Sequence, residues 1–228
     1  LWFILPVMAT NRLRFALMLG LIAVVSCTGA KPPEAPPKPA AAEPPKVELA
    51  DKPDKNQLAV FETTAGRIVV EFLPEHAPRH TLAFQNMLRS SFFDGTRFHR
   101  VVPKRFVQGG SPTTKDDNPY DDGLVQEWQR RIPAEISPRL RHTRGMVSAA
   151  HALDDIDSAT SQFFILATAE PSLDGKFTIF GRVVEGMDVV DKMATAPLRT
   201  DDSRLRERPA DPVTVTKAYL APRESLKK

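Results

Sequence analysis

The sequence lacks a second cysteine and has almost no excess of either charge. It contains one cysteine, Cys27, so no intrachain disulfide can form. Its 31 Lys and Arg residues stand against 28 Asp and Glu residues, and the formal net charge of +3 is too small to indicate nucleic-acid binding. With 42% hydrophobic residues, the composition is that of a soluble globular protein stabilised by its own core.

Motifs of covalent, phosphate and metal chemistry are also missing. The sequence contains no Gly-x-Ser-x-Gly, no glycine-rich phosphate loop and no His-Glu-x-x-His. None of its five histidines has ligand-like spacing to a second histidine or to the cysteine. The acidic stretch at residues 116–123 lacks the alternating aspartates of a helix–loop–helix calcium site, which favours a solvated loop. We therefore expect no metal and no cofactor.

Residues 1–26 have the pattern of a signal peptide. Arg12 and Arg14 precede an apolar run at residues 15–25 that is too short to span a ~30 Å hydrocarbon core comfortably. The run ends in Val24-Val25-Ser26-Cys27, which resembles a bacterial lipobox, where a small residue precedes a cysteine that becomes the lipidated N-terminus. The alternative is an ordinary signal peptide followed by a chance cysteine.

Lipid on Cys27 is expected to anchor the mature protein to a bacterial membrane, on the side that faces the periplasm. Several acyl chains hold a protein stably, because each buried CH₂ contributes about 0.8 kcal/mol. Thr28 stands where an aspartate would resemble an inner-membrane retention signal, so the outer membrane is favoured.

Residues 27–55 are predicted to be the lipidated N-terminus and a disordered linker. Eight prolines occur within residues 31–54, and such a segment favours extended polyproline II over a packed core. At ~3.1 Å per residue, residues 31–54 could span roughly 70 Å and so space the domain from the bilayer. A Pro-rich ligand for a partner protein is the alternative interpretation.

A folded domain is predicted over residues 56–222, followed by a short tail at 223–228. Residues 58–62 read as a strand. Within residues 67–72, Ile68, Val70 and Phe72 alternate with Arg67, Val69 and Glu71, which is the period of a half-buried strand. The Gly-containing link between these two runs is a turn signal. The two runs therefore predict a β-hairpin.

Further strands and two helices complete the predicted domain. A helix is predicted at 78–90, where Phe84, Met87 and Leu88 share one face, and a second helix is predicted at 187–194. The remaining strands are predicted at 97–102, 105–109, 146–150, 161–167, 178–184 and 213–220. Many short strands with two helices favour a mainly β protein, a closed antiparallel barrel with helices at its ends.

Five sequence runs carry the most specific signal. They are Phe98-His99-Arg100-Val101-Val102-Pro103, Phe106-Val107-Gln108-Gly109-Gly110, Ser161-Gln162-Phe163-Phe164, Leu173-Asp174-Gly175-Lys176 and Phe180-Gly181-Arg182-Val183. In this order and spacing they resemble the cyclophilin signature, over residues 57–221. The resemblance implies an eight-stranded antiparallel barrel capped by two helices. It also implies a monomeric peptidyl-prolyl cis/trans isomerase that binds proline-containing segments of unfolded or partly folded proteins and assists the folding of exported ones.

Arg100 resembles the catalytic arginine of that family. An X–Pro bond rotates against a barrier of ~18–20 kcal/mol, and its nitrogen becomes pyramidal and basic when the amide twists. An always-charged guanidinium aimed at this nitrogen would stabilise the twisted state without a covalent step. A charge-assisted hydrogen bond of about 1.5–3 kcal/mol corresponds to roughly one to two decades in rate. For Arg100 alone, a surface salt bridge is the alternative.

The resemblance assigns the other site residues as well. Gln108 and Gln162 would orient the arginine and the substrate carbonyl, with hydrogen bonding inside the barrel as the alternative. Four side chains would line an apolar cup for the proline ring, although aromatic residues on strands are usually core. These four are Phe106, Phe163, Leu173 and Phe177. Ala150 and His151 match a stretch whose main chain runs beside the substrate, and His99 is expected to pack behind the site.

Several positions depart from the family pattern. Arg105 stands where the family commonly has the phenylalanine of the proline pocket, so either Phe106 fills the cup after a local slip or a cation replaces part of its wall. Ser172 stands where many members have a tryptophan, and residues 124–131, which include Trp128, replace a glycine-rich loop. These departures keep a second function open, namely a chaperone or scaffold module that binds proline-containing segments with little or no turnover.

Overall fold

The computed structural model describes residues 48–121 and 129–226. The predicted signal peptide, Cys27 and most of the linker lie outside the described residues, as does the part of the predicted rim that contains Trp128. No helix within the two described ranges is long and apolar enough to cross a membrane.

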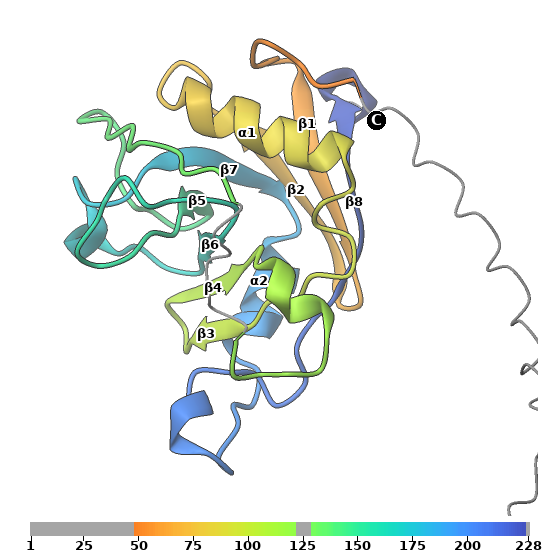
Figure 1. Ribbon diagram of the computed structural model, residues 1–228, viewed down its shortest axis with the longest axis vertical. Helices are drawn as coiled ribbons and strands as arrows, with labels where there is room; N and C mark the ends of the chain where they lie inside the picture. Colours follow the sequence, from red (N-terminus) through yellow and green to blue (C-terminus); the bar gives the residue numbers. More distant parts are fainter. Residues whose placement is uncertain (1–47, 122–128, 227–228) are drawn as a thin grey trace, which may run out of the picture. The chain divides into compact units, whose positions relative to one another are not determined.

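Eight strands form one curled antiparallel sheet (Figure 1). In chain order they are β1 (Gln57–Thr63), β2 (Gly66–Phe72), β3 (Arg100–Val102), β4 (Phe106–Gly109), β5 (Met146–Ala149), β6 (Phe163–Leu166), β7 (Ile179–Glu185) and β8 (Val215–Pro222). Their order across the sheet is β3-β4-β6-β5-β7-β2-β1-β8. An isolated bridge between Arg97 and Thr214, rather than a ladder of β3 with β8, joins the two edges. The predicted mainly β, eight-stranded antiparallel fold is confirmed.

The β1–β2 hairpin shows how the alternation in the sequence gives the sheet two faces. Ile68, Val70 and Phe72 of β2 belong to the main core cluster. Val69, between them, packs with Leu58 in a separate cluster. Successive side chains on a strand point to opposite faces, so the period of two observed in the sequence places the main core on one face only. The predicted hairpin is confirmed.

Two α-helices pack against the sheet, α1 (Pro78–Arg89) and α2 (Met187–Ala194). The first contacts β7 and β8 and the second contacts β2, β3 and β4, so they cover different parts of the curled sheet (Figure 1). Both match their predicted positions. Glu135 fixes the start of α1, because its carboxylate accepts hydrogen bonds from the main-chain N–H groups of Arg79 and His80 at 2.9 and 3.0 Å.

Four short 3₁₀-helices lie in the loops. They are η1 (Pro112–Lys115), η2 (Pro171–Leu173), η3 (Ser203–Leu205) and η4 (Arg223–Leu226). The last of them falls in the predicted tail, so the chain keeps regular structure beyond β8.

Aromatic rings fill the interior of the curled sheet. Five phenylalanines contact one another there: Phe61, Phe84, Phe93, Phe98 and Phe163. Each is at most 4% exposed. A ring pair of this kind contributes about 0.5–1.5 kcal/mol beyond the burial of its area. Because the interior is packed, a peptide-binding surface has to lie on the outside of the sheet.

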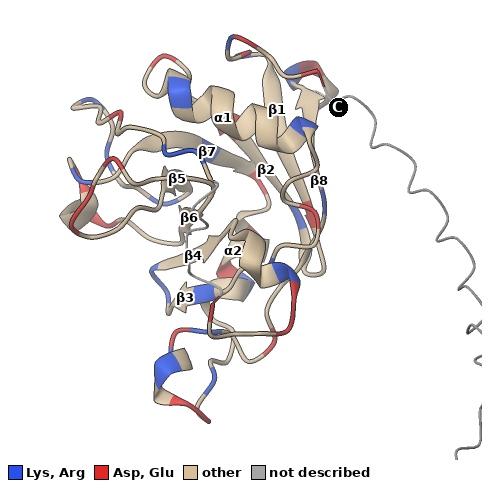
Figure 2. Cartoon of the chain, in the orientation of Figure 1, with Lys and Arg blue, Asp and Glu red and all other residues tan. Residues whose placement is uncertain are grey.

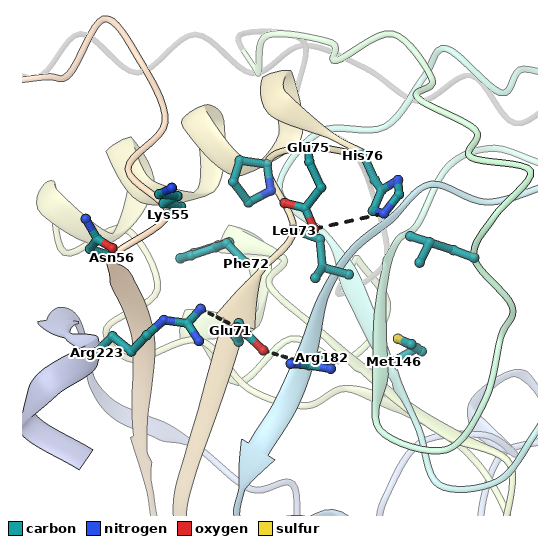
Figure 3. Close-up of a pocket in the computed structure, with 12 residues that line it drawn as sticks. Lys55, Asn56, Glu71, Phe72, Leu73, Glu75, His76, Met146, Arg182 and Arg223 are labelled. Carbon is teal, nitrogen blue, oxygen red and sulfur yellow. Dashed lines mark hydrogen bonds and ion pairs between the residues drawn. The ribbon is translucent and has the colours of Figure 1, made fainter. Parts of the chain in front are cut away.

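The outer face of β2 and β7 carries an ion-pair cluster. Glu71 is paired with both Arg182 and Arg223, which joins η4 to the sheet (Figure 3). Burial opposes ionisation of this carboxyl group, but the two guanidinium groups outweigh it and hold the pKa of Glu71 below its ordinary value. The surrounding pocket of about 510 Å³ also includes Lys55 and His76 but none of the predicted site residues.

Candidate active site

The β3–β4 hairpin places the predicted catalytic arginine and its neighbours on one face. Arg100 pairs with Gln108 in the antiparallel register, and Val102 pairs with Phe106. Cross-strand partners share a face, and so do residues two apart on one strand. Arg100, Gln108 and Phe106 therefore project together, while the alternate residue Val101 is fully buried in the main core.

Arg100 is held by contacts on three sides. Its Nη1 donates a hydrogen bond to Gln108 Oε1 at 3.1 Å, and its Nε donates to Glu207 Oε2 at 2.6 Å. Its Cζ lies 5.2 Å from the centre of the Phe106 ring, which is within cation–π range. The side chain is 42% exposed, and its Nη2 has no hydrogen-bond partner among the residues that the structure describes. A ligand can therefore reach a free donor of the guanidinium.

Gln108 and Gln162 extend the network away from Arg100. Gln108 Nε2 donates to Gln162 Oε1 at 3.0 Å, and both side chains are buried. A side-chain amide accepts with its oxygen and donates with its nitrogen, so Gln108 can accept from Arg100 and donate to Gln162 at the same time. The structure thus brings the three predicted catalytic residues into one hydrogen-bonded line.

The prediction that Phe163 lines the apolar cup is wrong. Its ring is 2% exposed and lies 5.5 Å from Phe61 in the core. The register gives the reason, because Phe164 is the residue that pairs with Gln108 across β4 and β6 and shares its face. The sequence signal for this was available, since Phe164 lies two residues after Gln162 and therefore on the same side of the strand.

Three phenylalanine rings form the apolar surface beside Arg100. The centre of the Phe164 ring lies 5.3 Å from that of Phe106 and 5.4 Å from that of Phe177. Phe164 is 4% exposed, whereas Phe106 and Phe177 are half-buried, so these two rings form the open side of the surface. Leu173, also half-buried, ends η2 in the loop that leads to Phe177. We call the rings of Phe106, Phe164 and Phe177 the aromatic cup.

Ala150 and His151 follow β5 at the edge of the cup. The Ala150 N–H donates to the Gln162 main-chain oxygen at 2.9 Å. The His151 ring stacks on Phe177 at 4.3 Å, and its Nε2 lies 2.9 Å from the Lys176 main-chain oxygen. The His151 side chain thus joins the loop after β5 to the wall of the cup.

Arg105 is engaged by Glu170. It precedes β4, its side chain is 48% exposed, and its guanidinium forms a two-contact ion pair with the carboxylate. This pair holds the pKa of Glu170 below its ordinary value. The pairing of Val102 with Phe106 is regular, so Phe106 reaches the cup by ordinary alternation and not by the local slip that the sequence suggested.

His99 lies next to the site without facing it. The side chain is 6% exposed, and burial lowers the pKa of its imidazole to about 4. The ring is therefore neutral at physiological pH, which agrees with the expectation that it packs behind the site. No group of three or more His, Cys, Asp or Glu side chains in the described ranges is arranged to hold a metal ion.

Glu207 also binds Arg100, although it lies outside every run of the sequence signature. It lies between η3 and β8, in a loop that carries charges of both signs (Figure 2). It contacts Arg100 across 107 positions of sequence, and no motif surrounds it. Only the folded structure reveals the contact.

The family model and the two relatives described next are all named as peptidyl-prolyl cis-trans isomerases. The family model for cyclophilin type peptidyl-prolyl cis-trans isomerase/CLD matches residues 58–220. Peptidyl-prolyl cis-trans isomerase ppi1 of Schizosaccharomyces pombe is 39% identical over 159 residues, which are 69% of this chain and 95% of that protein. Peptidyl-prolyl cis-trans isomerase-like 1 of Homo sapiens is 34% identical over 160 residues, 70% of this chain and 89% of that protein.

Solved structures show the same fold. A crystal structure of a Cryptosporidium parvum cyclophilin type peptidyl-prolyl cis-trans isomerase, in the presence of the dipeptide Ala-Pro, superposes with a TM-score of 0.62 at 24% identity. The match covers 72% of this chain and 98% of that one. Cyclophilin AquaCyp293 from Hirschia baltica gives a TM-score of 0.57 at 23% identity, over 73% of this chain and 74% of that one.

Proposed function

The chain belongs to the cyclophilin-type peptidyl-prolyl cis-trans isomerase family, and we propose that it speeds the rotation of X–Pro bonds in exported, partly unfolded proteins. One observation carries the proposal: the half-exposed guanidinium of Arg100 lies beside the aromatic cup, and its Nη2 makes no hydrogen bond to the described residues. The exported class of substrate is supported by the sequence of residues 1–27 alone.

The chemistry needs a charge that favours the twisted amide. When the X–Pro bond twists, resonance is lost and the lone pair of the prolyl nitrogen becomes available as an acceptor. A hydrogen bond from Arg100 to that lone pair exists only in the twisted state, so it lowers the barrier without stabilising the planar ground state. At about 1.5–3 kcal/mol, this single contact supplies roughly one to two decades in rate.

The neighbouring residues prepare the site before the substrate arrives. Gln108 fixes one terminal nitrogen of Arg100, and Gln162 fixes Gln108, so the guanidinium needs little reorganisation during the reaction. The aromatic cup offers an apolar surface to the pyrrolidine ring. When the cup holds the pyrrolidine ring, only the acyl side of the X–Pro bond rotates. The bound ring also excludes water from the site, which strengthens the hydrogen bond from Arg100 to the prolyl nitrogen.

A protease-coupled assay on a short X–Pro peptide tests the proposal. We expect the wild-type protein to isomerise the peptide faster than the uncatalysed background, and Arg100→Ala to lose most of that gain. If both proteins match the background, isomerase activity is refuted, and the chain is a module that binds proline-containing segments without turnover.

The location is the second part of the proposal: Cys27 carries lipid and holds the domain at a bacterial membrane on its periplasmic side, with the outer membrane favoured. The support is the lipobox-like sequence that ends at the single cysteine, together with the Pro-rich stretch that follows it. Cys27→Ala should move the protein from the membrane to the soluble periplasmic fraction, whereas Thr28→Ala should leave it at the membrane. Unchanged membrane fractionation of Cys27→Ala contradicts the lipid anchor.

A further inference from the structure

We propose that Glu207 is a positioning residue for catalysis, one that sets the orientation of the Arg100 guanidinium; the inference rests on the proposed isomerase activity. Glu207 Oε2 accepts the Nε–H of Arg100 at 2.6 Å, which is short even for a charge-assisted hydrogen bond. Both side chains are 42% exposed, so the pair borders solvent. A half-exposed ion pair contributes little to folding stability, and its value here lies in where it places the arginine.

The main chain holds Glu207 against the strand that carries Arg100. The N–H of Val101, the next residue along β3, donates to the Glu207 main-chain oxygen at 2.7 Å. The loop is tied back on itself by the bridge between Leu198 and Pro209. The Glu207 main chain is hydrogen-bonded to β3, so the Glu207 carboxylate is held close to Arg100 on the same strand.

Two contacts on different edges of a planar group define its orientation. Glu207 takes the Nε–H edge of Arg100, and Gln108 takes one hydrogen of Nη1. A guanidinium is rigid and planar, so these contacts together fix the plane and the direction of Nη2. If Gln108 were the only partner, the Arg100 guanidinium could rotate about the bonds of its side chain, because arginine has several freely rotating bonds.

Among the charged side chains nearby, Arg100 is the one that forms the ion pair with Glu207. Two other arginines line the cleft of about 410 Å³ that both residues share. Arg204 is paired with Asp202 and lies 4.6 Å from the centre of the Tyr120 ring, and Arg208 is buried, at 7% exposed. Arg100 is thus the arginine to which the carboxylate is bound, at a position where the pair remains accessible to a peptide.

Kinetics of the full-length protein test the inference. We expect Glu207→Ala to lower kcat by about three- to tenfold with KM nearly unchanged, because a misaligned donor loses transition-state contact more than ground-state binding. Glu207→Gln keeps an acceptor at the same place and should recover most of the loss. Asp201→Ala, which removes an exposed ion pair with Arg199 in the same loop, is the matched control and should leave kcat unchanged.

The decisive comparison repeats Glu207→Ala in the Arg100→Ala background. If Glu207 acts through Arg100, the second substitution has no further effect on kcat there. An equal fold-loss in both backgrounds, or no loss in the wild-type background, overturns the inference. Wild-type activity at the uncatalysed background would instead refute the proposed function. The Nε–H resonance of Arg100, assigned by its absence in Arg100→Ala, gives a readout without turnover: it should shift in Glu207→Ala, and an unchanged resonance contradicts the contact.

Discussion

The guanidinium carbon of Arg100 lies 5.2 Å from the centre of the Phe106 ring, so the positive charge lies directly beside the aromatic cup. The ring contacts Phe164 on its other side, at 5.3 Å. A proline ring resting on these aromatics would have its nitrogen close to a cation that the protein has already oriented. Phe106 therefore supplies the aromatic wall for which the family commonly uses the residue at position 105.

Replacing each of the two adjacent phenylalanines with alanine tests which ring serves the site. Both rings are buried, at 2% and 4% exposed, so both variants should lose stability, and the kinetic loss should distinguish them. Phe164→Ala should lower kcat/KM by roughly tenfold or more, because it removes the central ring of the cup. Phe163→Ala should cost about 3–5 kcal/mol of unfolding free energy, because its ring is enclosed in the core. The folded fraction of Phe163→Ala should keep near wild-type kcat/KM. Urea unfolding and the peptide assay measure both, and a larger kinetic loss for Phe163→Ala would reverse our assignment of the two faces.

Arg105 is predicted to be dispensable for turnover. Its ion pair with Glu170 is half-exposed on the arginine side, but the carboxylate is only 11% exposed, so Arg105→Ala should cost about 1–3 kcal/mol because Glu170 loses its partner. Because Phe106 provides the cup wall, kcat/KM should stay within about twofold of wild type. A loss comparable to that of Phe164→Ala would show that Arg105 belongs to the proline site.

Buried histidines should make the fold sensitive to acid. Burial lowers the pKa of His99 from 6.5 to about 4, so between these values the unfolded chain binds a proton that the folded chain does not. The free energy of unfolding should be constant above pH 6.5 and fall as the pH drops towards 4, by about 3 kcal/mol from this group.

His99→Gln checks the source of this pH dependence. The variant should show a smaller fall in unfolding free energy between pH 7 and pH 4.5. The fall should not disappear, because burial also lowers the pKa values of His80 and His142. His76→Gln, at a less buried position, is the control. An unchanged slope in His99→Gln would contradict the buried neutral state of this ring.

The sequence was informative wherever one local pattern decided the outcome. The alternation around Val69 predicted the first hairpin, and the spacing of Phe84 and Leu88 predicted the face of α1 that is buried. The signature runs predicted that Gln108 and Gln162 share one hydrogen-bonded network with Arg100. These features depend on neighbours in sequence or on a motif, and both can be read before the chain folds.

Two features of the site were not predicted from the sequence. Phe163 and Phe164 are adjacent and chemically identical, so residue type does not choose between them, and only the alternation from Gln162, which the register with Gln108 bears out, identifies Phe164 as the one that faces the site. Glu207 reaches Arg100 through a loop whose path depends on packing between distant segments. Residue type and spacing carry little information on such a contact.

Steady-state kinetics of Arg100→Ala and Arg100→Lys, combined with the Kd of a short X–Pro peptide, test the central claim most directly. We predict that Arg100→Ala lowers kcat by roughly 10- to 100-fold while the Kd changes by less than about threefold, since the contact forms in the twisted state. Arg100→Lys keeps the charge but loses the fork, and should recover only part of the rate. A kcat for Arg100→Ala equal to that of the wild type, with the peptide still bound, would contradict the account.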